Sequence, residues 1–94
     1  MILTNRLFEN TSLPEITALI QNIFDGKTFN YVITDDNPEN IYHKGVDLSL
    51  SDCINQVKTE LKKVQRTNKE AFASVTTKGS ETVLKFNGKK IEII

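Results

Sequence analysis

The sequence is poor in the residues that define specialised protein classes. Its 94 residues include no Trp, one Cys, one His, one Met, two Pro and four Gly. A single Cys excludes an internal disulfide and a cysteine zinc cluster, and the low Gly and Pro content excludes collagen-like and other low-complexity classes. No apolar run is longer than three residues, so we expect neither a membrane span nor a signal-peptide core.

What is present is the composition of a small globular protein. Apolar residues make up 38% of the chain, with five Phe and two Tyr, which is too apolar for a disordered tail. We expect one domain over residues 1–94. A chain of this length has few residues to spare for a deep substrate cleft, so a binding module is favoured over an enzyme.

The charges are balanced overall but not along the chain. Twelve basic residues match twelve acidic ones, yet residues 1–55 hold three cations and eight anions, a net charge of −5, and residues 56–94 hold +5. Such an asymmetry either cancels within the fold or marks a surface that binds a partner.

Two segments have the pattern of amphipathic helices. Ser12 and Glu15 form a capping box, and apolar residues follow at helical spacing, which predicts a helix over about residues 12–25. A second helix over about 50–67, capped by Ser49 or Ser51, carries the apolar seam Leu50, Ile54, Val57, Leu61 and Val64. Cys53 adjoins this seam and is expected to be buried.

The remaining segments alternate as strands do. Residues 27–34 and 41–48 flank a polar turn and predict a hairpin. Strands at 71–77 and 80–86 and a last strand from residue 89 predict a meander, joined by a Lys78-Gly79 turn and a type I′ turn at Asn87-Gly88. These two-residue turns place Ala73 opposite Leu84, Phe72 opposite Lys85, Lys85 opposite Lys90, and Phe86 opposite Lys89. Residues 1–8 fit a short strand or an apolar arm.

Together these elements predict an α+β fold. Two helices pack on an antiparallel sheet with a C-terminal three-stranded meander, in the order (β)αββαβββ.

The outer face of the predicted meander carries a possible anion site. Phe72, Lys85 and Lys90 form a row there, with Lys89 nearby. Opposed lysines repel unless they splay into water or an anion lies between them, and a ring beside cations can stack a nucleic-acid base. The alternative is that these lysines protect strand edges from aggregation.

The second helix carries another set of cations. Lys58, Lys62, Arg66 and Lys69 are spaced by 4, 4 and 3 residues and share one helix face. This stripe fits a phosphate backbone, an acidic protein partner, or a face that is simply solvated.

The turn at residues 35–40 is acidic. Asp35, Asp36 and Glu39 fit a polar hairpin loop that could contact a basic partner. The stretch lacks the Gly of a calcium loop, so we predict no metal site. His43 and Cys53 are the single residues of their types, and no catalytic or cofactor motif occurs. We therefore expect neither catalysis nor a cofactor.

These observations favour a partner-binding protein. Ile, Asn and Lys total 29 residues against two Arg, which is typical of AT-rich genomes such as those of low-GC bacteria and their phages. We predict a small cytoplasmic, non-catalytic protein-binding module of the inhibitor, immunity or regulatory type, with no membrane partner. The alternative is a nucleic-acid or nucleotide binder that uses the basic sheet face and helix, although zero net charge disfavours it. A homodimer is also compatible with the sequence.

Overall fold

The computed structural model describes residues 2–4, 12–21, 28–79, 82–87 and 90–93. Along the chain the elements are β1 (Ile2–Thr4), α1 (Leu13–Gln21), β2 (Phe29–Thr34), β3 (His43–Leu48), α2 (Leu50–Gln65), β4 (Phe72–Thr77), β5 (Leu84–Phe86) and β6 (Ile91–Ile93). Within these residues, the predicted α+β class with two helices and an antiparallel sheet is confirmed.

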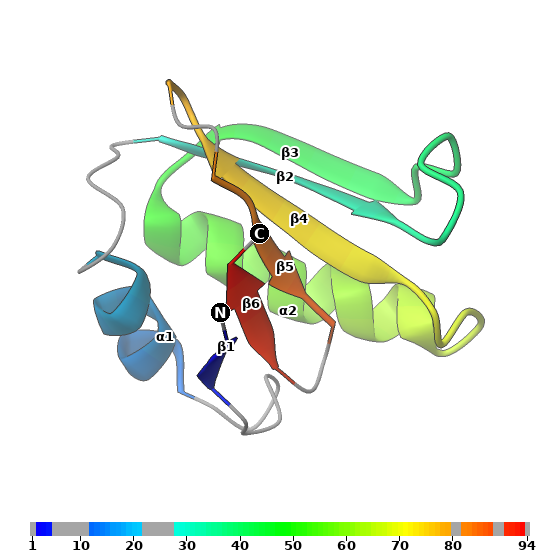
Figure 1. Ribbon diagram of the computed structural model, residues 1–94, viewed down its shortest axis with the longest axis horizontal. Coiled ribbons are helices and arrows are strands. Elements are labelled where there is room, and N and C mark those ends of the chain that lie inside the picture. Colours follow the sequence, from blue (N-terminus) through cyan, green and yellow to red (C-terminus); the bar gives the residue numbers. More distant parts are fainter. Residues whose placement is uncertain (1, 5–11, 22–27, 80–81, 88–89, 94) are drawn as a thin grey trace.

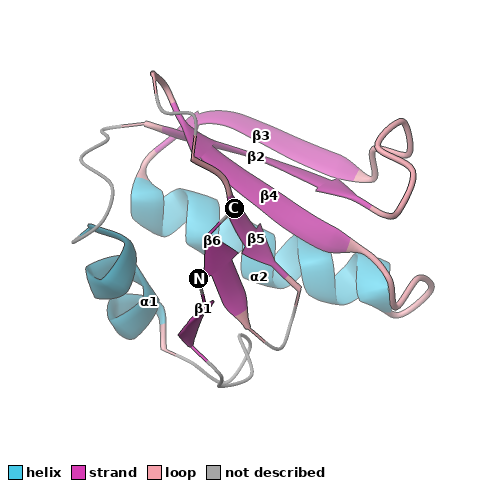
Figure 2. Ribbon diagram, viewed as in Figure 1, coloured by secondary structure: helices cyan, strands magenta, loops and turns pink. Residues whose placement is uncertain are grey.

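The strands form one six-stranded sheet in the order β1-β6-β5-β4-β2-β3. Every neighbouring pair is antiparallel. Both helices contribute to a single core on one side of the sheet (Figures 1 and 2), where α2 contacts β2, β3, β4 and α1. None of the helices in the described part of the chain is long and apolar enough to cross a membrane.

Serine caps begin both helices. The Glu15 N–H donates to Ser12 Oγ at 3.3 Å, and the Asp52 N–H donates to Ser49 Oγ at 3.3 Å. Each bond satisfies an N–H that has no partner inside the helix, and the second identifies Ser49 as the cap of α2. The predicted end of the first helix, near residue 25, lies outside the described residues.

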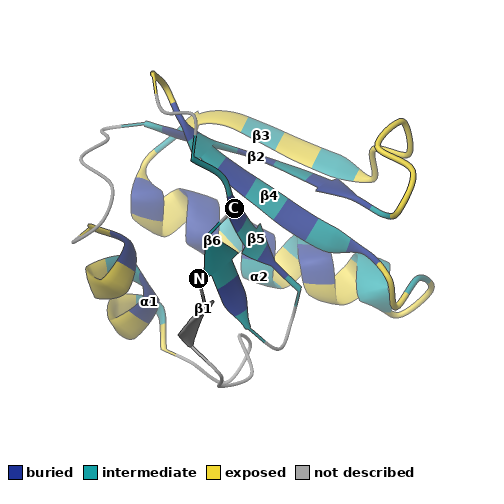
Figure 3. Ribbon diagram, in the orientation of Figure 1, coloured by how far each residue is buried: buried dark blue, intermediate teal, exposed yellow. Residues whose placement is uncertain are grey.

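The core lies between α2 and the inner face of the sheet. Alternate residues of β4 are buried, as Figure 3 shows by colour. On α2 the buried positions are those of the predicted seam together with Cys53, whereas Val64 is partly buried. The buried apolar residues of the strands are Phe29, Tyr31, Ile33, Ala73, Val75, Leu84, Phe86 and Ile91. The period-two alternation therefore identified the inner face correctly.

The register between β4 and β5 differs from the prediction. Val75, not Ala73, pairs with Leu84, and Ser74, not Phe72, pairs with Lys85. A two-residue type I′ turn needs positive φ at both positions. Gly79 has φ 85°, but Lys78 does not have positive φ. The connection is therefore longer, and the register moves by two residues, which leaves every side chain on its predicted face.

The register between β5 and β6 also moves by two residues. Phe86 pairs with Ile91 and Lys85 pairs with Glu92, so the predicted Phe86–Lys89 and Lys85–Lys90 pairs are wrong. Gly88 of the predicted type I′ turn lies outside the described residues, and beside it Asn87 Oδ1 accepts the Lys90 N–H at 3.0 Å. Opposite charges on Lys85 and Glu92 replace the repulsion that two facing lysines would have.

Strand β3 forms one edge of the sheet and contains a β-bulge. The pairing with β2 shifts between Phe29 and Tyr31, where two residues of β3 face the single residue Asn30. Asp47 has φ 55°, and its N–H donates to Asn30 Oδ1 at 2.9 Å. The neighbouring Val46 is 64% exposed.

Truncation of the α2 seam tests the core assignment. Leu61 is 2% exposed, so Leu61→Ala should lower the free energy of unfolding by about 2–4 kcal/mol through lost burial and a cavity. Urea denaturation measures this loss, and Lys62→Ala on the exposed side of the same helix is the control. Equal urea midpoints for the two variants would show that Leu61 does not pack in the core.

Candidate functional site

The predicted row of cations on the sheet is interrupted by an acidic residue. Lys85 Nζ lies 4.4 Å from the centroid of the Phe72 ring, so these two predicted site residues do meet. Lys90, which directly precedes β6, is instead held by Glu92 of that strand, with Nζ and Oε1 3.4 Å apart. Lys89 lies outside the described residues. Glu92, the cross-strand partner of Lys85, thus brings a negative charge to the face where an anionic ligand was expected.

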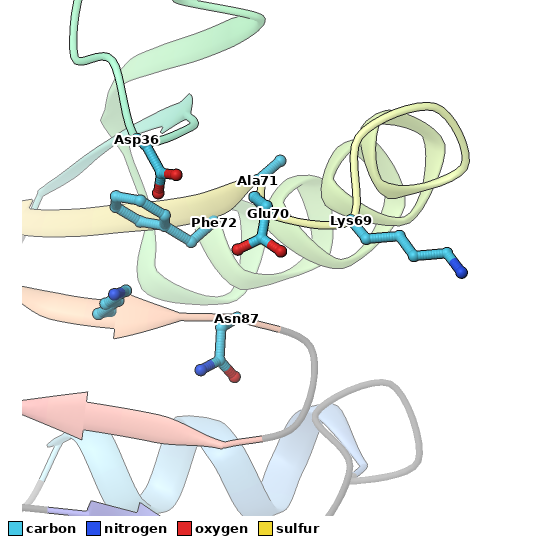
Figure 4. Close-up of a pocket in the computed structure, with 7 residues that line it drawn as sticks. Asp36, Lys69, Glu70, Ala71, Phe72 and Asn87 are labelled. Atoms are coloured by element: carbon cyan, nitrogen blue, oxygen red, sulfur yellow. The ribbon is translucent and has the colours of Figure 1, made fainter.

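A hollow of about 260 Å³ lies beside the Phe72 ring. It brings together residues that the sequence analysis assigned to three separate features, since it is lined by Asp36, Lys69, Glu70, Ala71, Phe72, Lys85 and Asn87. Figure 4 shows Asp36 and Glu70 near the ring, while the Lys69 side chain points away from it. Two carboxylates and two ammonium groups give this hollow no preference for an anion.

The outward side of α2 carries a surface of one charge sign. Lys58, Lys62, Lys63 and Arg66, with Thr59, line an open hollow of about 350 Å³; these four cations are called the basic α2 surface below. Lys69 lies outside it, beyond the end of the helix. Lys63 Nζ lies 3.5 Å from Glu60 Oε1, but Lys62 and Arg66 have no acidic partner among the described residues.

The acidic turn is built around Asp35. Its carboxylate accepts hydrogen bonds from the Tyr42 hydroxyl at 2.7 Å, the Asn37 N–H at 2.8 Å and Asn68 Nδ2 at 3.0 Å. The Tyr42 bond, followed by the Asn37 bond, holds the pKa of Asp35 below its ordinary value. Asp35 therefore anchors the turn to the loop after α2, while Asp36 and Glu39 remain exposed.

A polar cluster that the sequence analysis did not identify lies between the β2–β3 hairpin and α2. Tyr31 Oη lies 2.7 Å from His43 Nδ1 and donates to Gln56 Oε1 at 3.0 Å. On the other side of the imidazole, His43 Nε2 lies 3.9 Å from Glu60 Oε2. We call Tyr31, His43, Gln56 and Glu60 the His43 network. Hairpin pairing alone could have placed Tyr31 and His43 on one face, but not the two α2 residues.

Close packing holds the rings of this network in place. The Tyr31 and His43 rings stack with centroids 5.8 Å apart and planes 11° from parallel. Gly45 faces Tyr31 across the hairpin, and a Cβ at Gly45 would overlap the Tyr31 ring. Burial, with a smaller contribution from the Glu60 charge, raises the pKa of Tyr31, so its hydroxyl remains protonated at neutral pH.

The remaining candidates for chemistry show no reactive arrangement. Cys53 is fully buried, and burial raises the pKa of its thiol to about 12, so little thiolate exists at neutral pH. Among the described residues, no group of three or more His, Cys, Asp and Glu side chains could hold a metal ion.

The Asp35 anchor predicts a specific acid response. Because its folded-state pKa is lowered, ionised Asp35 favours folding above the unfolded-state pKa of about 3.9. That contribution is lost as the pH falls through the lower folded-state pKa. Asp35→Asn should therefore unfold at lower urea concentration than wild type at pH 7, with the difference shrinking towards pH 2. Asp36→Asn is the control, and an identical pH profile for Asp35→Asn and wild type would contradict the assignment.

The burial of Cys53 predicts protection from thiol reagents. A disulfide reagent at pH 8 should modify the native protein at least about a hundredfold more slowly than the urea-unfolded protein, because both access and ionisation are suppressed. Stopped-flow absorbance measures both rates. Comparable rates in the two states would place Cys53 at the surface.

Comparisons with known proteins identify no relative. No protein-family model matches the chain, and no curated protein or solved structure matches it. Among the described residues, the basic α2 surface brings four cations to one hollow.

Proposed function

We propose that the protein is a small, non-catalytic, cytoplasmic binding module of the inhibitor, immunity or regulatory type. Its basic α2 surface docks on an acidic patch of a protein partner. One observation carries the proposal: four cations surround a single hollow on an exposed helix face, and two of them have no acidic partner among the described residues.

The spacing of these cations is unfavourable for the isolated protein. Lys62 follows Lys58 by four residues and precedes Arg66 by four, so like charges are neighbours along the helix. Each such pair destabilises a helix by about 0.2–0.5 kcal/mol. An acidic partner would remove this repulsion on binding, which supports a surface adapted to contact anions rather than water alone.

Several features favour a protein over a nucleic acid as the partner. The sheet face loses its predicted cationic character, because Glu92 lies opposite Lys85 and pairs with Lys90. The basic α2 surface spans nine residues from Lys58 to Arg66, only about 12 Å along the helix axis. The net charge of zero also lacks the excess of cations that nucleic-acid binders use.

The buried chemistry supports a role without catalysis. The Cys53 thiol is enclosed in the core, and the imidazole of His43 is held by Tyr31 and Glu60. In the described structure, the side-chain contacts of His43 are with Tyr31 and Glu60, and Cys53 is not placed to form a nucleophile–base pair with it. Binding is therefore the activity for which the described surface is best suited.

Removal of the two unpaired cations tests the proposal. We expect Lys62→Gln with Arg66→Gln to weaken binding of a 12-residue poly-aspartate peptide about two- to thirtyfold at low salt, as expected for two exposed ion pairs. Gln preserves helix propensity. Isothermal titration calorimetry measures the affinity, and the protein partner captured with wild type should be lost with the same variant.

The matched control removes two other exposed lysines. Lys44→Gln with Lys78→Gln changes the net charge equally but leaves α2 intact, so it should bind as wild type does. Equal loss in both variants would show that only net charge matters and would overturn the proposal. Tighter binding to a DNA or RNA 12-mer than to the peptide, with the same dependence on Lys62 and Arg66, would instead favour the nucleic-acid alternative.

A further inference from the structure

The His43 network touches the basic α2 surface through one residue. Glu60 is the acidic side chain that the two groups share: its Oε1 lies 3.5 Å from Lys63 Nζ and its Oε2 lies 3.9 Å from His43 Nε2. The Glu60 side chain is 25% exposed and that of His43 is 40% exposed, so both are partly shielded from water. The charge of His43 therefore acts directly on the acidic neighbour of the basic α2 surface.

The number of available protons decides which protonation state of His43 allows all the contacts of the network to form. The Tyr31 hydroxyl has one proton but two acceptors within reach, His43 Nδ1 and Gln56 Oε1. If neutral His43 carries its proton on Nε2, that N–H faces Glu60 at 3.9 Å, but Nδ1 then competes with Gln56 for the Tyr31 proton. If it carries the proton on Nδ1, the Nε2 lone pair faces the Glu60 carboxylate.

The doubly protonated ring has no such conflict. Nδ1–H donates to Tyr31 Oη, the Tyr31 hydroxyl donates to Gln56 Oε1, and Nε2–H points to Glu60. All three contacts are then formed by one arrangement of the same atoms. Histidine is the side chain type whose ordinary charge change falls between about pH 5 and 8.

We infer that protonation of His43 strengthens the binding of acidic partners by the basic α2 surface. This inference rests on the proposed function and adds its regulation. The four cations of the surface and Glu60 together carry +3, and a protonated His43 raises this to +4. Protonation also gives Glu60 a second cation to pair with, which weakens its hold on Lys63.

Few other titratable groups face His43, so few could cause a pH dependence of peptide binding through this network. Tyr31 packs on it from β2, and Glu60 faces it from α2, with Lys63 beyond Glu60. Tyr31 stays neutral in this range because burial raises its pKa. The sequence contains a single His, so His43→Gln removes all imidazole titration from the protein.

Peptide binding at two pH values tests the inference. A poly-aspartate 12-mer is a suitable probe because Asp stays ionised at pH 5.5. We expect wild type to bind it about two- to fivefold more tightly at pH 5.5 than at pH 7.5. This is the size of effect expected from one added positive charge near the binding surface. His43→Gln should lose this difference. Glu60→Gln at pH 7.5 also carries +4 and should bind about as tightly as wild type at pH 5.5.

The outcomes separate this inference from the proposed function. If wild type and His43→Gln bind the peptide with the same pH dependence, the inference fails while the proposed function stands. If neither binds at either pH, the proposed function fails.

The proton positions in the His43 network can also be tested without any binding partner. Proton NMR at pH 5.5 should show a slowly exchanging Nδ1–H signal that Tyr31→Phe removes. Its absence from folded wild type would overturn the arrangement of protons on which the inference depends.

Discussion

The packing of α2 across β2, β3 and β4 is the constraint on which the rest of the structure depends. Its seam of apolar side chains faces the sheet, so the rotation of the helix about its own axis is set by burial. Once that rotation is set, Lys62 and Arg66 must face solvent, and Gln56 and Glu60 must face the β2–β3 hairpin. The basic α2 surface and the His43 network are thus two consequences of one hydrophobic contact.

The C-terminal end of α2 also positions the meander. Gln65 Nε2 donates to the carbonyl of Ala71 at 2.9 Å and to that of Asn87 at 3.0 Å, so one amide joins the segment before β4 to the residue after β5. Among the described residues, no buried side-chain nitrogen or oxygen lacks a hydrogen-bond partner. Since unpaired buried polar groups are costly, Gln65 helps to select the register that the structure adopts.

Among the described residues, the Lys–Glu ion pairs do not join the acidic half of the chain to the basic half. In the described residues, the Lys–Glu pairs join Lys63 to Glu60 and Lys90 to Glu92, all within the basic half. The acidic half instead satisfies Asp35 with neutral donors from Tyr42 and Asn68. The excess of cations therefore remains at the surface of α2, where the proposed partner would meet it.

What could be predicted from the sequence depended on how local the determining interaction was. The Ser12 cap and the inner-face positions of the strands follow from spacing and alternation and were predicted correctly, and Ser49 was one of two candidates for the second cap. The register between β5 and β6 depends on where the chain turns, and a turn centred on Asn87-Gly88 predicted pairs that are wrong by two residues. The His43 network combines side chains from β2, β3 and α2, so it could not be predicted from the sequence pattern of any one element.

The bulge in β3 has a consequence for how copies of the protein meet one another. A regular edge strand with an exposed Val46 would offer unpaired backbone groups to a strand from another molecule. The left-handed conformation of Asp47 breaks that row, and its N–H is already committed to Asn30. With the Lys44 charge also on this strand, the edge resists strand addition. The protein can thus be present at high concentration with an open sheet edge and still avoid growth into fibrils.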